Sequence, residues 1–358
     1  MERNLIDCVN NQSNLQGKKY WKASEIHNLI DENKKDIAFI TGNGVNLYFA
    51  DDIYSKENKR ANIKSWKDLL LSLWNKDNKV IEEEKIREIP FGLSYTESFD
   101  LLDLKRTLPR QLRSEDITPQ MVSRIFAGIT PNVKTDVTNE MENWKGGHKV
   151  EKFVRAIKKL ETPFLTTNFD EVLPSSLNLK EKTTTRLPQK CTSNSKRFRW
   201  NYYYSDQGSL ELPTSGFGIW HINGSVCHPE SISFGLCDYM FNVTIARNMI
   251  QGIDKPDTFS GKHTSYWPGC NTWLHIIFNK SLFIFGLSLG ENETFLRWLL
   301  IQRAKYFALY RTSDTDHQGW YVADPKDISE GKRFFLESAG FEIINIKKYK
   351  TIYEDVWK

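Results

Sequence analysis

The side chains that could do chemistry in this sequence are concentrated in four short motifs. The first is Gly42-Asn43-Gly44-Val45-Asn46, which follows an apolar run. A glycine-rich turn between a strand and a helix lets backbone N–H groups approach a phosphate. Leu47 stands where the dinucleotide-binding fingerprint has its third glycine, so an ordinary strand-to-helix turn is an equal alternative.

The second motif, Thr166-Thr167-Asn168-Phe169-Asp170, follows another apolar run. The amide of Asn168 could hold a ribose hydroxyl or a water molecule at the carboxyl end of a strand, where open α/β sheets bind ligands. Asp170 could accept hydrogen bonds from a ligand. The alternative, which this motif taken alone favours, is a strand end in which Asp170 caps a short helix.

The third motif is Trp220-His221-Ile222-Asn223-Gly224-Ser225, in which a histidine ends an apolar run. Histidine exchanges its proton near neutral pH, so His221 could act as a general base. A histidine at a strand end is more often structural, and that alternative stays open.

The fourth motif runs from Phe283 to Glu293 and contains Gly286, Ser288 and Glu291. Its small residues would allow a ribose or an adenine to approach closely. A plain strand-to-helix connection would need the same residues.

The elements that must position these motifs alternate between strand and helix. Apolar runs predict strands at 36–41, 163–167, 217–223, 282–286, 320–323 and 341–346. Helical spacing of apolar residues appears at 150–160, 270–279, 293–307 and 328–339. This alternation predicts an α/β fold with a Rossmann-like, mostly parallel sheet covered by helices.

The predicted Rossmann-like domain comprises 36–66 and 150–358, preceded by an N-terminal helical segment at 1–35. Residues 67–149 are rich in Lys, Glu, Leu and Trp and are too many for a simple crossover, so we expect an inserted helical subdomain. Residues 180–204 carry many Lys and Arg among polar residues and are expected to form a loop or lid.

Composition narrows the function classes. The net charge of +4 lacks the basic surplus of a nucleic-acid binder, although local basic patches leave nucleic-acid contact open. The five Cys include no C-x-x-C pair, which favours a reducing cytoplasm over a disulfide framework. The longest apolar run, at 281–289, is too short to span a bilayer, and no signal peptide is expected.

The order and residue types of the four motifs together resemble the SIR2 family. The resemblance implies that the NAD+ phosphates and the nearby ribose contact Gly42, Asn43, Gly44 and Asn46. It places the nicotinamide end at Asn168 and Asp170, with His221 as the base and Asn168 positioning a water or a ribose hydroxyl. It places the adenosine half at Gly286, Ser288 and Glu291.

The sequence departs from the family pattern at several points. Asn46 stands where the family commonly has Ser, and Glu291 where related defence proteins often have Asp. The paired zinc cysteines of sirtuin deacylases are missing, and the spacing of Cys227, His228 and Cys237 is poor for structural zinc. The chain therefore looks more like the zinc-free SIR2 proteins of bacterial antiviral systems of Thoeris, Argonaute-associated, HerA-associated or Kongming type.

That resemblance implies a cytoplasmic enzyme that hydrolyses NAD+ to nicotinamide and ADP-ribose without a metal. Such an activity would be toxic if it were constant, so we also expect control by a partner defence subunit, by a bound nucleotide signal or by assembly into a homo-oligomer. Two alternatives remain, an NAD-dependent protein deacylase and a non-catalytic module that binds NAD+ or a related nucleotide and regulates a partner.

Overall fold

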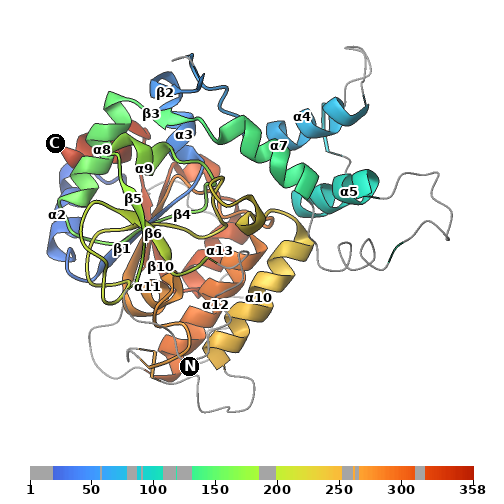
Figure 1. Cartoon of the computed structure of the whole chain (residues 1–358). Coiled ribbons are helices and arrows are strands. Elements are labelled where there is room, and N and C mark those ends of the chain that lie inside the picture. The colour runs from blue at the N-terminus through green and yellow to red at the C-terminus, as the bar shows by residue number, and fades with distance from the viewer. Residues whose placement is uncertain are drawn as a thin grey trace.

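An eight-stranded sheet forms the centre of the protein in the computed structural model (Figure 1). The structure describes residues 19–56, 59–78, 87–89, 92–107, 118, 131–184, 199–251, 261–262, 266–310 and 319–358. The strands of the sheet are β1 (Ile37–Thr41), β4 (Phe164–Thr166), β5 (Lys180–Thr183), β6 (Tyr202–Ser205), β7 (Ile219–His221), β8 (Ser281–Phe285), β9 (Gly319–Ala323) and β10 (Phe341–Asn345).

The strands are mostly parallel, in the order β10-β9-β8-β1-β4-β7-β6-β5. The six strands from β10 to β7 pair in parallel, and β6 and β5 add an antiparallel edge. Phe39 in β1 lies opposite Phe164 in β4 and Phe283 in β8. Strands that are buried on both faces consist of continuous apolar runs. The strand predictions from the sequence were based on such runs.

Helices cover both faces of the sheet, so the predicted α/β, Rossmann-like architecture is confirmed (Figure 1). One face carries α2 (Ala23–Glu32), α8 (His148–Lys158) and α14 (Lys350–Tyr353). The other carries α10 (Leu236–Gln251), α11 (Trp273–Asn279), α12 (Thr294–Leu309) and α13 (Glu330–Ser338). Successive residues of β1 serve the two cores in turn, with Phe39 in the first and Ile40 in the second.

The chain reverses its direction of travel across the sheet between β1 and β8. From β1 it proceeds to β4 and β7 on one side, and it then returns to build β8, β9 and β10 on the other. In doubly wound sheets the crevice outside the carboxyl ends of the strands at such a switch point is where ligands bind. The turns containing Gly42 and Gly286 follow these two strands, so the fold places the first and fourth motifs side by side.

Three described helices that lie between β1 and β4 in the chain form a group apart from the two helical layers (Figure 1). They are α4 (Trp66–Asn78), α5 (Tyr95–Thr107) and α7 (Pro131–Met141). A two-stranded antiparallel sheet joins the chain on either side of them, with β2 (Ile53–Tyr54) paired to β3 (Lys145–Gly146). The described part of the expected insertion is therefore mainly helical, and its ends meet at β2 and β3.

Asp52 fixes the same junction through two hydrogen-bonding groups. Its carbonyl accepts from the Gly147 N–H at 2.7 Å, and its carboxylate accepts from the Val150 N–H at 3.0 Å. A Cβ on Gly147 would lie 2.4 Å from the Asp52 carboxylate, so only glycine fits there. The first turn of α8 is thereby tied to the segment that leaves β1.

One sequence prediction is partly wrong, and one helix was not predicted. The expected loop at 180–204 is wrong at both ends, because these form the paired strands β5 and β6; residues 185–198 lie outside the described residues. A charged strand at the edge of a sheet has the composition of a loop, which explains the error. The helix α10 was not predicted.

In the N-terminal segment, expected to be helical over 1–35, α2 occupies Ala23–Glu32 and residues 1–18 lie outside the described ranges. Within those ranges no helix combines the length and the apolar character needed to cross a bilayer.

Candidate active site

A cavity of about 710 Å³ lies at the carboxyl edge of the sheet, at the switch point between β1 and β8. The strand ends contribute Gly44 after β1, Thr167 after β4 and Gly286 after β8 to its wall. The insertion contributes Trp66, Lys67, Tyr95, Thr96 and Phe99. Its volume falls in the range of small-molecule and cofactor sites, roughly 300–1,000 Å³.

The two glycine turns at this cavity pack directly against each other. The Gly44 N–H donates to the Gly286 carbonyl at 2.8 Å, and a Cβ on Gly44 would lie 2.6 Å from that oxygen. The Val45 N–H donates to the Gly42 carbonyl. Glycine is therefore required here for contact between turns, and neither N–H is available to a phosphate in this arrangement.

The two asparagines of the first motif have different positions. Asn43 lines the cavity, and its side-chain amide donates to the Lys64 carbonyl at 2.8 Å, which ties the turn to the start of the insertion. Asn46 is fully buried and lies outside the cavity wall. Its amide donates to the Asp170 carboxylate at 2.6 Å, while its own oxygen has no partner among the described residues.

Asp170 is a buried hub that joins the first two motifs. One carboxylate oxygen accepts from Asn46, and the other accepts from the Val172 N–H at 3.0 Å, at the start of α9 (Val172–Ser176). Burial raises the pKa of Asp170. The contact with the Val172 N–H is an Asx-type turn, while the N-cap residue of α9 is Glu171, and the Asp170 carboxylate also binds the amide of Asn46.

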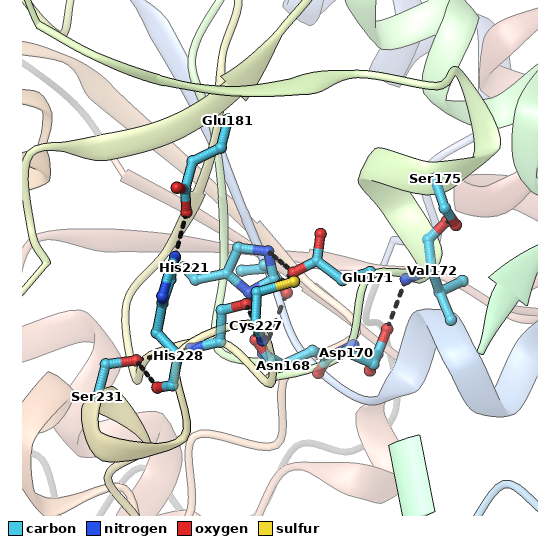
Figure 2. Close-up of polar contacts among 12 residues, drawn as sticks. Asn168, Asp170, Glu171, Val172, Ser175, Glu181, His221, Cys227, His228 and Ser231 are labelled. Atoms are coloured by element: carbon cyan, nitrogen blue, oxygen red, sulfur yellow. Dashed lines mark hydrogen bonds and ion pairs between the residues drawn. The ribbon is translucent and has the colours of Figure 1, made fainter. Parts of the chain in front are cut away.

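Asn168 and His221 lie against each other behind this hub. Thr166 and His221 are register partners in β4 and β7, and Asn168 follows β4 by two residues. The His221 Nδ1 lies 2.8 Å from the Asn168 carbonyl oxygen (Figure 2). A carbonyl only accepts, so Nδ1 carries the proton and the neutral ring presents its lone pair at Nε2.

Two polar atoms of this pair have no hydrogen-bond partner among the described residues, the His221 Nε2 and the Asn168 side-chain nitrogen. Both side chains are buried. Buried polar atoms are normally paired, so an unpaired one is free to bond to a water molecule or a ligand. An available base lone pair and an available amide donor therefore lie within one hydrogen-bonded unit.

A second cavity adjoins the first, with a volume of about 20 Å³, large enough for one water-sized group. Asn168 and Asp170 line it, and Asn43, Ser65 and Trp66 line both cavities. His221 lies in neither wall. The side chains of Asn43, Ser65 and Trp66 therefore separate the large cavity from the Asn168–His221 pair.

The fourth motif lines the cavity only in part. Gly286 and Ser288 contribute to the wall as expected of neighbours of a ligand, but Glu291 is exposed and lies outside it. Glu293 and Asp327 are the acidic residues of the wall, and burial raises the pKa of Glu293 to about 7. Asn292 accepts a hydrogen bond from the Tyr95 N–H at 3.0 Å, which ties the insertion to this turn.

Sequence reasoning missed the aromatic and basic residues of the wall. Tyr48 and Tyr353 stack at 4.5 Å between ring centroids although they are far apart in the sequence, and both line the cavity. Lys67 and Lys332 are the basic side chains of the wall. The aromatic content of 13% was the only sequence signal for the aromatic residues, and it does not indicate which of them line a site.

The described residues contain no group of His, Cys, Asp and Glu side chains that could hold a metal ion. Cys227 and Cys237 are free and exposed. Cys227 lies near His221 (Figure 2), and partial burial of its thiol, although the residue as a whole is exposed, raises its pKa, so it stays protonated at neutral pH.

Comparison with known proteins adds no assignment to this geometry. No protein-family model matches the chain, and no curated protein matches its sequence.

Proposed function

We propose that this protein hydrolyses NAD+ at the bond between nicotinamide and ribose. The observation that carries the proposal is the hydrogen bond from His221 Nδ1 to the Asn168 carbonyl at 2.8 Å, which leaves Nε2 as a base. The pair lies beside a cavity at the switch point of a Rossmann-like sheet. The motif resemblance to zinc-free SIR2 proteins supplies the substrate and an NAD+-depleting role in bacterial antiviral defence.

In the proposed complex the dinucleotide occupies the large cavity. Lys67 and Lys332 supply positive charge for its phosphates, in place of the Gly44 and Val45 N–H groups that are engaged within the protein. The aromatic wall contacts its rings. The nicotinamide ribose must reach Asn168, so the proposal requires the side chains of Asn43 and Trp66 to move apart and join the two cavities.

The proposed reaction assigns one role to each residue of the pair. The Asn168 amide holds the attacking water or a ribose hydroxyl. His221 Nε2 takes a proton from the water as the water oxygen bonds to C1′, and nicotinamide leaves with the electron pair of the broken C1′–N bond. General-base catalysis of this kind contributes about 10²–10⁴-fold in rate.

The test is nicotinamide release by purified wild-type protein and by His221→Ala and Asn168→Ala. His228→Ala is the matched control, since His228 is a neighbouring histidine that lies 2.6 Å from Glu181 on the edge strand β5 (Figure 2). We expect loss of activity in the first two variants and not in the control. Either variant releasing nicotinamide at the wild-type rate would show that the assignment is wrong.

The assay is run with and without candidate partner proteins encoded nearby, because a toxic activity is expected to be controlled. Release only in the presence of a partner would support the proposed control. NAD+ binding without release under every condition would favour the regulatory binding module, and removal of an acetyl group from a peptide would favour the deacylase.

A further inference from the structure

Glu171 directs its carboxylate at the His221 ring. It follows Asp170 and stands just before α9, and its side chain is 14% exposed. One carboxylate oxygen, Oε1, lies 3.9 Å from His221 Nε2 and accepts a hydrogen bond from the Ser225 hydroxyl at 2.7 Å. Figure 2 shows the His221 ring between Asn168 and Glu171. The two ring nitrogens thus have different neighbours: Nδ1 bonds to the Asn168 carbonyl, and Nε2 faces the Glu171 carboxylate.

The distances show that Glu171 acts on Nε2 and not on Nδ1. Nδ1 is committed to the Asn168 carbonyl, so a proton taken up by the ring goes to Nε2. At 3.9 Å the carboxylate makes no hydrogen bond with the neutral ring, but it is close enough to stabilise a positive ring strongly. The effect of Glu171 is therefore small before proton uptake and large after it.

The other titratable groups around His221 do not supply this negative charge. The Tyr204 ring lies 5.6 Å from the His221 ring, and burial raises the pKa of Tyr204 far above neutrality. Burial also raises the pKa of the Cys227 thiol. Asp170 is held by Asn46 and the Val172 N–H, and its pKa too is raised by burial.

We propose that Glu171 is a positioning residue that stabilises the imidazolium formed when His221 Nε2 accepts a proton. This inference rests on the proposed function, because it assigns a partner to the base of that reaction. Ser225 holds the carboxylate in place, and its hydroxyl keeps Oε1 aimed at the ring. This role depends on the negative charge of Glu171, so a neutral side chain of the same shape would not stabilise the imidazolium.

The test variant is Glu171→Gln, which keeps an oxygen for the Ser225 hydroxyl and removes only the charge. The matched control is Glu181→Gln, which neutralises the glutamate of the second Glu–His pair, where Glu181 lies 2.6 Å from His228. We expect Glu171→Gln to lower kcat about tenfold with KM within about twofold, and to move the acidic limb of the pH–rate profile to lower pH. Glu171→Asp should recover part of the loss, and the control should leave all three quantities unchanged.

An NMR titration of labelled histidine separates this inference from the proposed function. The His221 signal is identified by its absence in His221→Ala, and its titration midpoint should lie at lower pH in Glu171→Gln than in wild type, because the carboxylate that faces Nε2 has lost its charge. An unchanged midpoint would overturn the inference, whether or not the protein cleaves NAD+. A shifted midpoint in a protein that releases no nicotinamide would support the charge pairing and count against the proposed function.

Discussion

Substituting Gly286 with alanine tests the contact between the switch-point turn and the C-terminal helix. Gly286 has a φ of +62°, and a Cβ there would lie 2.2 Å from the hydroxyl oxygen of Tyr353. Tyr353 is buried and packs against Tyr48, Phe49, Phe153 and Phe285, so it has little room to move aside. Its hydroxyl has no hydrogen-bond partner among the described residues.

The expected loss of stability has two separable parts. A left-handed backbone costs an alanine about 1–2 kcal/mol relative to glycine. Forcing the methyl group against a packed side chain adds about 1–3 kcal/mol. Gly286→Ala should therefore lower the free energy of unfolding by about 2–5 kcal/mol.

Tyr353→Phe isolates the second part. It removes the oxygen that the methyl group would meet, and because that hydroxyl makes no hydrogen bond with any described residue, the single change should be close to neutral. In the double mutant Gly286→Ala/Tyr353→Phe only the backbone cost of about 1–2 kcal/mol should remain. The two substitutions are therefore expected to be non-additive, with the second rescuing part of the first.

Urea unfolding followed by tryptophan fluorescence measures all four proteins, with equal slopes as the check that the same transition is compared. Wild-type stability in Gly286→Ala would refute the close approach. A double mutant no more stable than Gly286→Ala would refute the role of the Tyr353 hydroxyl in it.

Two further predictions concern charges held inside the protein. Burial raises the pKa of Glu293 from 4.5 to about 7, so the folded protein binds this proton more tightly and loses stability as pH rises between these values. Glu293→Gln should remove that loss and be more stable than wild type at pH 8 by at most about 3 kcal/mol, with little gain below pH 5; parallel thermal-melt curves over this range would contradict it. Lys134 in α7 and Asp238 in α10 form a buried ion pair at 3.0 Å. Lys134→Met should cost about 3–5 kcal/mol by leaving a buried charge, and Lys134→Met/Asp238→Asn should recover most of it in the same melts; a double mutant as unstable as the single would count against this reading.

The parts of the fold that could be predicted from the sequence are those governed by local patterns. Residues 37–40 are all apolar because β1 is buried on both faces, and α8 shows a single apolar stripe at Val150, Phe153, Val154 and Ile157. The edge strand β5 reads Lys-Glu-Lys-Thr and lacks such a pattern, because partial exposure does not select apolar residues. Its pairing with β6 follows from tertiary context.

The candidate site likewise contains some residues that could be predicted from the sequence and others that could not. Asn168 and His221 could be proposed from sequence because each ends a strand, and the carboxyl ends of parallel strands share one edge of the sheet. The engagement of the Gly44 N–H by Gly286 depends on how two distant turns pack. The placing of Glu293 in the wall, with Glu291 outside it, depends on the first turn of α12. Neither is encoded in spacing along the chain.

The junction at Asp52 joins the two ends of the chain segment that contains the helical insertion. Because β2 pairs with β3 and Asp52 holds Gly147 and Val150, the two ends of the excursion meet beside the sheet whatever lies between them. Lengthening a closed excursion is cheap, about 0.6 kcal/mol for each doubling. The segment between β2 and β3 carries Trp66, Tyr95 and Phe99, so a change in this segment alters one wall of the cavity, whereas β4 and β7, the strands that position Asn168 and His221, lie outside the segment.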